Sequence, residues 1–449
     1  MVRSRYKSLV DSLAAEIRSG RLAPGTRLPT HRTLAAAEGV ALATATRIYA
    51  ELASMGLVSG EAGRGTFVRE LGLPPGHGVD QQATAPEMLD MNFNYPALPE
   101  QTELLRSGLR HLASAGDLEA LLRYQPHAGR PHERAAVARY LACRGLAVTA
   151  QQVLIVSGAQ HGLAVSVMAL LDPGDVVAVD SLSYPGFKVL AESQRLELLP
   201  VAVVDQGTGM QPDMDALAAC CAQRRVRAIY AMPTVHNPLS WVLTLSQRRR
   251  LVAIARKHDL LIIEDAAYAF LADAPPAPLA ALAPERTLYV SGFSKNLATG
   301  LRVGYVVAPV KWVPRLERVI RATTWNTPGV MSALVCHWLA DGTAARVEAQ
   351  KRADAATRQA LARRILGDRR CIGHAESYFL WLPLPAEVRA EQVVMALLHA
   401  NVAVSSAEPF THAQQVPHAL RLALGSLPLP LLETALQRVV QVISDWELR

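Results

Sequence analysis

From residue 89 onward, short apolar runs alternate with longer helix-like stretches, and this alternation constrains the fold more than any other feature. The runs are Val153–Val156, Val176–Val179, Ala228–Ala231, Leu260–Glu264, Thr287–Val290 and Val303–Val307. Buried parallel strands read as uninterrupted apolar runs, and each parallel pair needs a crossover connection, usually a helix. The pattern therefore predicts an α/β fold with a doubly wound, mostly parallel sheet.

The last part of the chain follows a different pattern. Residues after about 320 are rich in helix formers and return to strand-like runs near Tyr378–Leu382 and Leu420–Leu424. Strands that follow a run of helices favour a separate α+β unit. We expect a small C-terminal domain, joined by parts of residues 89–145.

One lysine lies in a setting suited to Schiff-base chemistry. Residues 291–304 read SGFSKNLATGLRVG, with Lys295 directly after Ser294 and Arg302 seven residues later. A lysine that forms a Schiff base needs a shaped apolar site, and a phosphate bound beside it needs hydroxyl, amide and guanidinium donors. A surface lysine and a packed-loop arginine would explain this segment about as well if it stood alone.

Three further segments carry candidate site residues. The run Val153–Val156 leads through SGAQHG at residues 157–162 into an apolar helix-like run, and such a strand–turn–helix segment forms an anion site. Asp265 ends another strand, where a carboxylate faces the ligand crevice of an open sheet. Arg421 lies inside an alternating apolar stretch, where an arginine is costly unless an anion or a structural ion pair neutralises it.

Together these segments resemble the fold type I aminotransferases, which carry pyridoxal 5′-phosphate (PLP). The resemblance implies that Lys295 binds the cofactor, that Asp265 pairs with the pyridine nitrogen, and that Arg421 binds a substrate α-carboxylate. It assigns the phosphate to Gly158, Ala159, Gln160, Ser294 and Arg302, the ring to Tyr184, and the phenolic oxygen to Asn237 and Tyr268. The catalytic group would be Lys295, Asp265 and Tyr184, Asn237 would also face the substrate, and Tyr124 would reach the phosphate in the neighbouring subunit.

One position departs from the family pattern. Three residues before the lysine the family places Ser or Thr, and this chain has Gly292, with Ser291 one step earlier. One phosphate hydroxyl contact is therefore missing from the expected set. Ser294 and Arg302 would have to carry more of the anchoring.

Residues 1–70 have the pattern of a separate DNA-binding domain. Leu9, Leu13 and Ile17 have helical spacing, and residues 29–37 and 44–55 predict two more helices on either side of Gly39. Residues 56–68 predict a small hairpin whose tip is GRG at 63–65. Two helices joined at a glycine and followed by a hairpin predict a winged helix-turn-helix.

This segment resembles the GntR family of regulators through PGTRLPTHRTLA, ATATRIYAEL, MGLV and GRGTFV. We expect the second and third helices and the wing to contact DNA through Arg32, Thr44, Thr46, Arg47, Arg64, Gly65 and Thr66. The family often begins the recognition helix with Ser-Arg, and this chain has Ala41 and Leu42, so the helix starts apolar. A solvated surface charge is the alternative for Arg47.

The charge and cysteine content agree with an intracellular DNA partner. Residues 1–70 contain ten Lys and Arg and six Asp and Glu, so this segment contributes +4 to the formal net charge of +7. The five cysteines are scattered without a C-x-x-C pair, so neither a zinc site nor a disulfide framework is indicated, and a reducing cytoplasm is expected. No apolar run approaches the length that spans a membrane.

The combination resembles the MocR subgroup of GntR regulators. It implies residues 1–70 as a winged helix-turn-helix, 71–88 as a flexible linker, and 89–449 as a PLP-dependent aminotransferase-like effector domain. The expected partners are double-stranded operator DNA, an amine, amino-acid or PLP effector, and a second copy in a head-to-tail homodimer. A catalytically active aminotransferase with an appended DNA-binding domain is the alternative.

Overall fold

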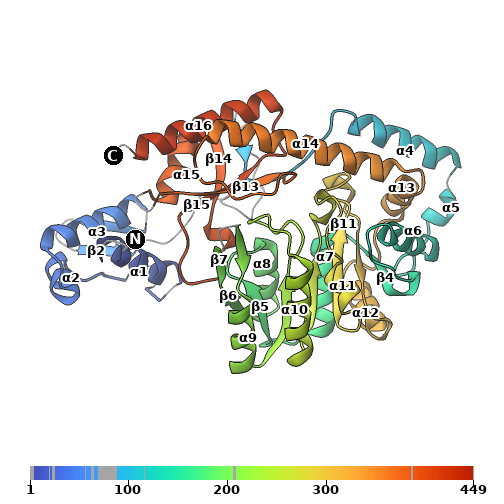
Figure 1. Cartoon of the computed structure of the whole chain (residues 1–449), viewed down its shortest axis with the longest axis horizontal. Helices are drawn as coiled ribbons and strands as arrows, with labels where there is room; N and C mark the ends of the chain where they lie inside the picture. Colours follow the sequence, from blue (N-terminus) through green and yellow to red (C-terminus); the bar gives the residue numbers. More distant parts are fainter. Residues whose placement is uncertain are drawn as a thin grey trace.

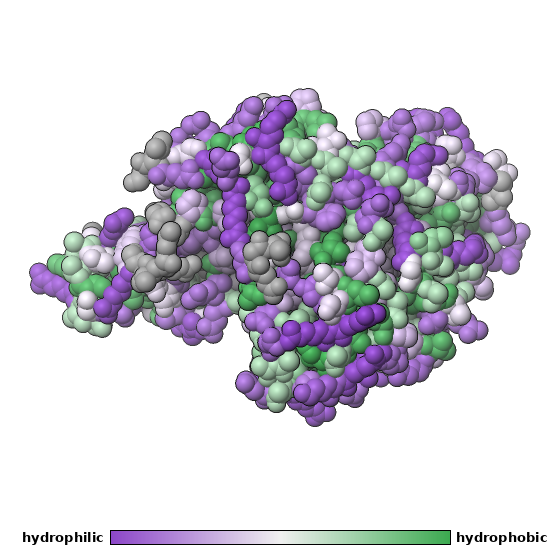
Figure 2. All heavy atoms as spheres, viewed as in Figure 1, coloured by the Kyte–Doolittle hydropathy of each residue, from purple (hydrophilic) through white to green (hydrophobic). Residues whose placement is uncertain are grey.

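A computed structural model describes residues 5–19, 21–22, 26–55, 57–61, 65–68, 88–115, 117–205, 209–385 and 388–447. Figure 1 shows an N-terminal unit in blue, a large sheet and its helices mostly in teal, green and yellow, and a smaller unit mostly in orange and red. The face seen in Figure 2 is largely hydrophilic, with apolar residues in small scattered patches. Within the described ranges, no helix combines the length and apolar character needed to cross a bilayer.

The N-terminal unit is a three-helix bundle with a hairpin. It consists of α1 (Arg5–Arg18), α2 (His31–Glu38), α3 (Leu42–Ser54), β1 (Val58–Glu61) and β2 (Gly65–Val68). The Thr30 hydroxyl caps α2 by accepting from the Thr33 amide, and Gly39 ends that helix at a φ of 60°. Val10, Ile48 and Leu52 belong to its buried core. The predicted winged helix-turn-helix is confirmed, while the predicted linker and Arg64 lie outside the described residues.

The large domain contains a seven-stranded sheet in the order β4-β12-β11-β10-β9-β5-β6. Its strands are β4 (Val153–Val156), β5 (Val176–Asp180), β6 (Glu197–Val201), β9 (Val226–Ala231), β10 (Leu261–Asp265), β11 (Thr287–Gly292) and β12 (Gly304–Val307). Only β12 runs against its neighbours in this sheet. All six predicted runs are strands, which confirms the mostly parallel α/β sheet. The edge strand β6 was not predicted, because Pro200 interrupts its pattern.

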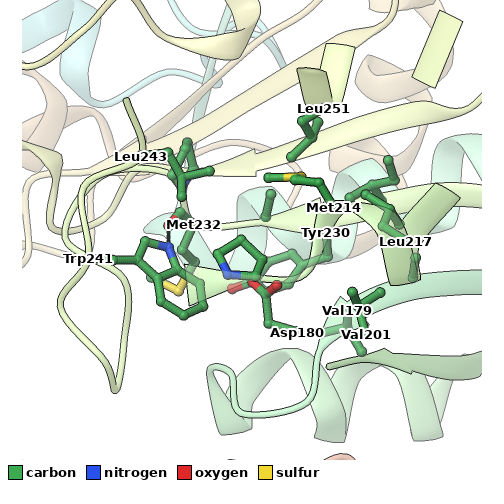
Figure 3. A pocket seen from close by; sticks show the side chains of 15 residues that line it. Val179, Asp180, Val201, Met214, Leu217, Tyr230, Met232, Trp241, Leu243 and Leu251 are labelled. Carbon is green, nitrogen blue, oxygen red and sulfur yellow. Dashed lines mark hydrogen bonds between the residues drawn. The ribbon is translucent and has the colours of Figure 1, made fainter. Parts of the chain in front are cut away.

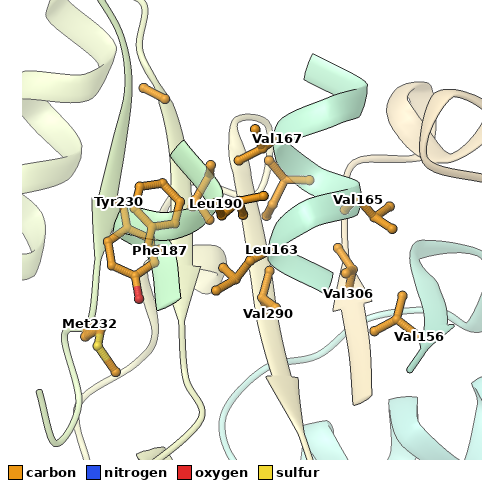
Figure 4. Packing of buried hydrophobic residues seen from close by; sticks show 14 of the residues in the cluster. Val156, Leu163, Val165, Val167, Phe187, Leu190, Tyr230, Met232, Val290 and Val306 are labelled. Atoms are coloured by element: carbon orange, nitrogen blue, oxygen red, sulfur yellow. The ribbon is translucent and has the colours of Figure 1, made fainter. Parts of the chain in front are cut away.

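The large domain surrounds this sheet with helices, most of which pack on one of its two faces. They are α4 (Gln101–Ala115), α5 (Leu118–Leu121), α6 (Pro131–Ala142), α7 (Ala159–Leu170), α8 (Pro185–Ser193), α9 (Met214–Gln223), α10 (Leu245–Lys257), α11 (Leu279–Leu282), α12 (Val313–Thr323) and α13 (Gly329–Ala340), with a hairpin of β7 (Val203–Asp205) and β8 (Met210–Pro212). Leu163 of α7 packs between Val290 and Phe187 in the cluster shown in Figure 4. Phe187 stacks on Tyr230 with ring centroids 3.9 Å apart.

A small void interrupts the packing on the opposite face of the sheet. It measures about 20 Å³ and is lined by residues such as Val179, Met214 and Trp241 (Figure 3). The Trp241 indole N–H donates to the Met232 carbonyl at 3.2 Å. A void of this size holds at most a single water molecule, so it is a packing defect and not a ligand site.

The small domain packs three helices on a four-stranded sheet of order β13-β15-β14-β3. Its elements are β3 (Leu89–Met91), α14 (Thr343–Leu366), β13 (Phe379–Pro383), α15 (Ala390–His399), β14 (Val402–Ser406), β15 (Ala419–Ala423) and α16 (Leu429–Glu447). The expectation that residues after about 320 all belong to this domain is wrong for α13. That helix buries Leu334 and Val335 against Val137 of α6, because its apolar residues surround the helix and need neighbours on more than one side.

Candidate functional site

A cavity of about 640 Å³ between the large and small domains contains many of the predicted site residues. It lies at the carboxyl ends of the parallel strands, where loops from several strands converge. Its lining includes Asn92, Phe93, Asn94, Tyr95, Ala159, Gln160, Tyr184, Asn237, Asp265, Tyr268, Gly292, Ser294, Lys295, Arg302, Phe410 and Arg421. The volume lies within the ordinary range for cofactor and substrate pockets. Residues predicted from distant parts of the sequence are thus brought together.

Lys295 lies in the loop after β11 and is half-buried. Its Nζ donates to the Asn94 carbonyl at 3.0 Å and lies 5.9 Å from the centre of the Tyr268 ring. Asn94 belongs to the segment after β3, so the lysine reaches across the cavity to a segment about 200 residues away in sequence. An amine in this place can react with a group held in the cavity.

The N-terminus of α7 forms an anion cradle with Arg302. Gly158 has a φ of 88° and precedes α7, and a Cβ at this position would lie 2.7 Å from Arg302 Nη2. Arg302 itself has a φ of 51°, and its guanidinium donates to Ser294 Oγ at 3.3 Å and to the Ser157 carbonyl at 3.4 Å. First-turn amides of a helix have no intrahelical acceptors, so this end attracts a phosphate.

Gly292 explains the departure from the family pattern. A Cβ at this position would lie 3.1 Å from the Val303 carbonyl and 3.2 Å from the Ala159 amide. Backbone atoms on both sides therefore disfavour Ser or Thr here. Ser291 does not substitute for the missing hydroxyl, because it is buried and donates to the Ala266 carbonyl at 3.0 Å.

Asp265 ends β10 as a buried carboxylate. Burial raises its pKa, while the Ala267 amide at 3.0 Å and the Tyr230 hydroxyl at 2.8 Å stabilise the charged form and oppose that rise. A carboxylate held this way can pair with a protonated ring nitrogen. Burial also raises the pKa of Tyr184, which keeps that hydroxyl neutral at physiological pH.

Asn237 and Tyr268 lie on loops after β9 and β10. Asn237 is 4% exposed, and its side-chain oxygen has no partner among the described residues. The Tyr268 ring packs edge-on against Phe379 with centroids 5.0 Å apart. The Gln160 side-chain amide donates to the Gly186 carbonyl at 2.9 Å, so its backbone amide in the first turn of α7 is the group left for the predicted anion contact.

Arg421 lies on β15 and is 4% exposed. Its Nη1 donates to the Asn92 carbonyl at 2.7 Å, its Nε has no partner among the described residues, and its guanidinium lies 5.0 Å from the Phe379 ring centre. Burial lowers its pKa. A buried guanidinium with an unused donor beside a cavity is suited to bind a carboxylate.

Tyr124 is not brought to the cavity within one chain. It is 86% exposed and lies 5.6 Å from Trp325, centroid to centroid. This placement is compatible with the expected contact to a second subunit, which stays a prediction.

The described residues that were predicted to contact DNA belong to the N-terminal unit and are exposed or partly exposed. Arg32, Thr46 and Arg47 are exposed, and Thr44 and Thr66 are partly buried. The Arg47 guanidinium lies 4.7 Å from the Tyr6 ring centre. At Gly65 the φ of 120° disfavours any residue other than glycine, and a Cβ would lie 2.8 Å from Arg27 Nε, which would have to move.

Sequence reasoning missed a buried lysine behind Lys295. Lys351 of α14 is 0% exposed, and its Nζ donates to the carbonyls of Lys295 at 3.0 Å and Leu297 at 2.8 Å. Burial, and next the charge of Lys295, lower the pKa of Lys351 from 10.5 to about 7. A neutral Lys351 amine has two N–H groups, and these two carbonyls accept one hydrogen bond from each. The only sequence signal for Lys351 is that a charged residue occurs within a helix-forming stretch.

We predict a pH effect on stability from Lys351. Because its folded pKa is below its unfolded value, the unfolded chain binds more protons between pH 7 and 10.5, so folding stability rises with pH there by about 1.4 kcal/mol per unit. Lys351→Met should lack this rise, whereas exposed Lys257→Met should keep it. Calorimetric unfolding at pH 7 and 9.5 measures the difference, and parallel curves for all three proteins would contradict the assignment.

Arg302→Ala and Asp265→Asn should each weaken PLP binding. The first removes a charge-assisted phosphate bond worth roughly 1.5–3 kcal/mol, and the second removes the charge opposite the ring nitrogen while retaining a group that the Tyr230 hydroxyl can reach. Titration followed by absorbance measures both affinities. Arg249→Ala and Asp273→Asn, both at exposed positions, are the matched controls, and wild-type affinity in both site variants would exclude this site.

Known proteins resemble this chain over both parts. The family model for aminotransferase class I and II matches residues 86–439, and that for bacterial regulatory proteins of the gntR family matches residues 5–68. The chain is 26% identical over 420 residues to the HTH-type transcriptional regulator YdeF of Bacillus subtilis, covering 93% of this chain and 90% of that protein. It is 28% identical over 397 residues to the probable rhizopine catabolism regulatory protein MocR of Rhizobium meliloti, covering 81% and 78%.

A solved structure resembles the larger part. The α-aminoadipate aminotransferase LysN of Thermus thermophilus, complexed with N-(5′-phosphopyridoxyl)-L-leucine, matches with a TM-score of 0.73 and 27% identity. The match covers 81% of this chain and 94% of that one.

Proposed function

The chain belongs to the aminotransferase class I and II family and carries a gntR-family DNA-binding domain, and from this premise we propose that it is a MocR-type transcription regulator that senses an amine or amino acid. One observation carries the proposal: a helix-turn-helix with exposed Arg32 and Arg47 and a cavity with Lys295, Asp265 and Arg421 occur in one chain. A DNA reader has no role in amino-group transfer.

The cofactor of this family is PLP, and the cavity fits it. A 640 Å³ space joins an anion cradle at α7 to a buried carboxylate at Asp265, and the Asn237 side-chain oxygen lacks a partner among the described residues. When bound, PLP supplies an aldehyde that reacts with amines and a ring that withdraws electrons. Arg302 and the Ala159 amide would hold its phosphate.

The remaining groups would select and hold the effector. Lys295 supplies an amine beside the site, and its carbonyl is fixed by Lys351. Arg421 would bind an α-carboxylate through its unused Nε, and Phe410 lines that end of the cavity, with its ring centre 5.8 Å from the guanidinium carbon of Arg421. Because Arg421 and Asn92 belong to the small domain and Lys295 to the large one, a ligand that contacts both stabilises one relative position of the two domains.

We also propose a head-to-tail homodimer in the cytoplasm, where DNA is accessible. Large apolar side chains lie exposed near Tyr124, namely Leu118 at 49%, Leu122 at 88%, Trp325 at 41% and Val330 at 40%. Exposed apolar side chains that gather in one region mark an association surface. A second copy covering them would bring its own Tyr124 toward the phosphate cradle, and sedimentation equilibrium tests the dimer.

An active aminotransferase is the second candidate, because Arg421 and Lys295 together form the apparatus of substrate binding and proton transfer. One preparation decides between the two. In a regulator, DNA affinity should change between PLP-loaded, PLP-free and amine-treated protein, and Lys295→Ala should abolish the change while keeping basal DNA affinity. Amino-group transfer, if measurable, should be slow. Fast, substrate-selective amino-group transfer together with a DNA affinity that does not change on adding amines would show that the protein is an enzyme instead.

A further inference from the structure

An ion cluster joins the DNA-binding unit to the small domain. Arg389, directly before α15, has a side chain only 1% exposed. Its Nε donates to Glu51 Oε1 of α3 at 2.6 Å, and its Nη1 contacts Asp11 Oδ1 of α1. His418 lies on the other side, with its Nε2 2.6 Å from Arg389 Nη1 and 3.4 Å from Asp11 Oδ1.

The cluster fixes how the two units meet. Removing a guanidinium from water is costly, and both carboxylates that offset this cost at Arg389 come from the DNA-binding unit. Burial alone would raise the pKa of Asp11, but His418 and Arg389 hold it below its usual value. Separating the two units would therefore break these ion pairs and require water to solvate the charged groups on both sides. Glu51 lies four residues after Arg47 on the recognition helix, so the contact acts on the DNA-reading element itself.

One short strand links this cluster to the effector cavity. His418 directly precedes β15, and Arg421 lies three residues further along it, about 10 Å away at the usual rise of a strand. The His418 carbonyl accepts from the Leu384 amide at 2.9 Å, which ties it to the segment leading to Arg389. At the other end, Ser405 pairs with Arg421 in the sheet, and Ser405 Oγ donates to Asn92 Oδ1 at 3.2 Å.

We propose that Arg389 and His418 form the docking surface for α1 and α3 of the DNA-binding unit, and that β15 couples this surface to carboxylate binding at Arg421. The coupling rests on the proposed function, since it requires an effector that carries a carboxylate. A ligand that draws Arg421 toward the cavity displaces His418 on the same rigid strand and changes the docking contact. Ligand binding thereby changes the orientation of the recognition helix.

Docking is tested first, on the full-length protein without effector. The double variant Asp11→Asn, Glu51→Gln leaves the small domain intact and should release the DNA-binding unit, which increases the radius of gyration in small-angle X-ray scattering. Arg389→Gln removes the other half of the contact and should give the same increase. Glu38→Gln, at a partly exposed position of the DNA-binding unit, and Arg438→Gln, at an exposed position of the small domain, are the controls and should scatter like wild type. Unchanged scattering of the folded double variant, checked by circular dichroism, overturns the docking surface.

Coupling is tested through its reciprocity, since binding energies between two sites must be symmetric. Each of the twenty amino acids is titrated into PLP-loaded protein by absorbance, and each that binds is compared with the matching amine that lacks the carboxylate. The Asp11→Asn, Glu51→Gln variant should change the affinity for the amino acid by roughly fivefold or more, and leave the affinity for the amine unchanged. Equal affinities for the amino acid in wild type and variant overturn the coupling. If no amino acid binds, amino-acid sensing itself fails, and with it the coupling, while the scattering result still decides the docking surface.

Discussion

Lys295→Ala is expected to abolish the visible absorbance of the purified protein. The proposed covalent attachment of PLP needs the Lys295 amine, and the remaining contacts would hold the cofactor only non-covalently. Loss of the attachment should remove the band that arises from the cofactor joined to lysine, and added PLP should not restore it. Absorbance spectra before and after PLP addition measure this directly.

Two comparisons make the Lys295 result specific. Lys257→Ala removes an exposed lysine at the end of α10 and should keep the wild-type spectrum. Lys351→Met removes the buried amine behind the loop and should keep the attachment, because its Nζ contacts only backbone carbonyls there. A cofactor band that persists in Lys295→Ala would show that another amine carries the cofactor, and the proposed site would be wrong.

Arg32→Ala combined with Arg47→Ala is expected to cause the second large loss, in DNA affinity. Both side chains are exposed on the helix-turn-helix. A base contact contributes roughly 1–3 kcal/mol, and a lost phosphate contact lowers the slope of affinity against salt by about one. Affinity should therefore fall at least tenfold at moderate salt, with a flatter salt dependence.

Fluorescence anisotropy with an operator fragment selected from genomic DNA, repeated at several salt concentrations, measures both quantities. Arg106→Ala and Arg110→Ala remove two exposed arginines from α4 of the large domain and serve as the charge-matched control. If the control variant loses as much affinity as the Arg32 and Arg47 variant, the effect is one of total charge, and the assignment to the helix-turn-helix fails.

Residue patterns predicted the secondary structure and the class of the fold well. The run Val153–Val156 is a strand with the same bounds, and the other five runs differ from their strands by at most two residues at either end. Such runs are local signals, since a strand buried on both faces must be apolar throughout. Edge strand β6 lacks this signal, because Pro200 interrupts its apolar run. A proline is tolerated at that position because an edge strand has no neighbour on one side.

The candidate site was predictable for a related reason. Asp265 is the last residue of a strand, and Lys295, Asn237 and the turn before α7 follow the carboxyl ends of other strands. Parallel strands bring those ends to one edge of the sheet. The resemblance to aminotransferases then assigned a role to each residue. Asn92 and Asn94 were not predicted, because β3 joins the small-domain sheet beside β14, more than 300 residues away.

Local periodicity and the positions of strand ends were enough to predict the order of elements, the class of both domains and the residues that gather at the cavity. Tertiary structure alone decided which buried charges meet. Lys351 contacts the Lys295 carbonyl across 56 residues, and Arg389 contacts Asp11 across 378. No local pattern encodes such pairs, since each charge is stable in the interior only when the folded chain supplies its partner.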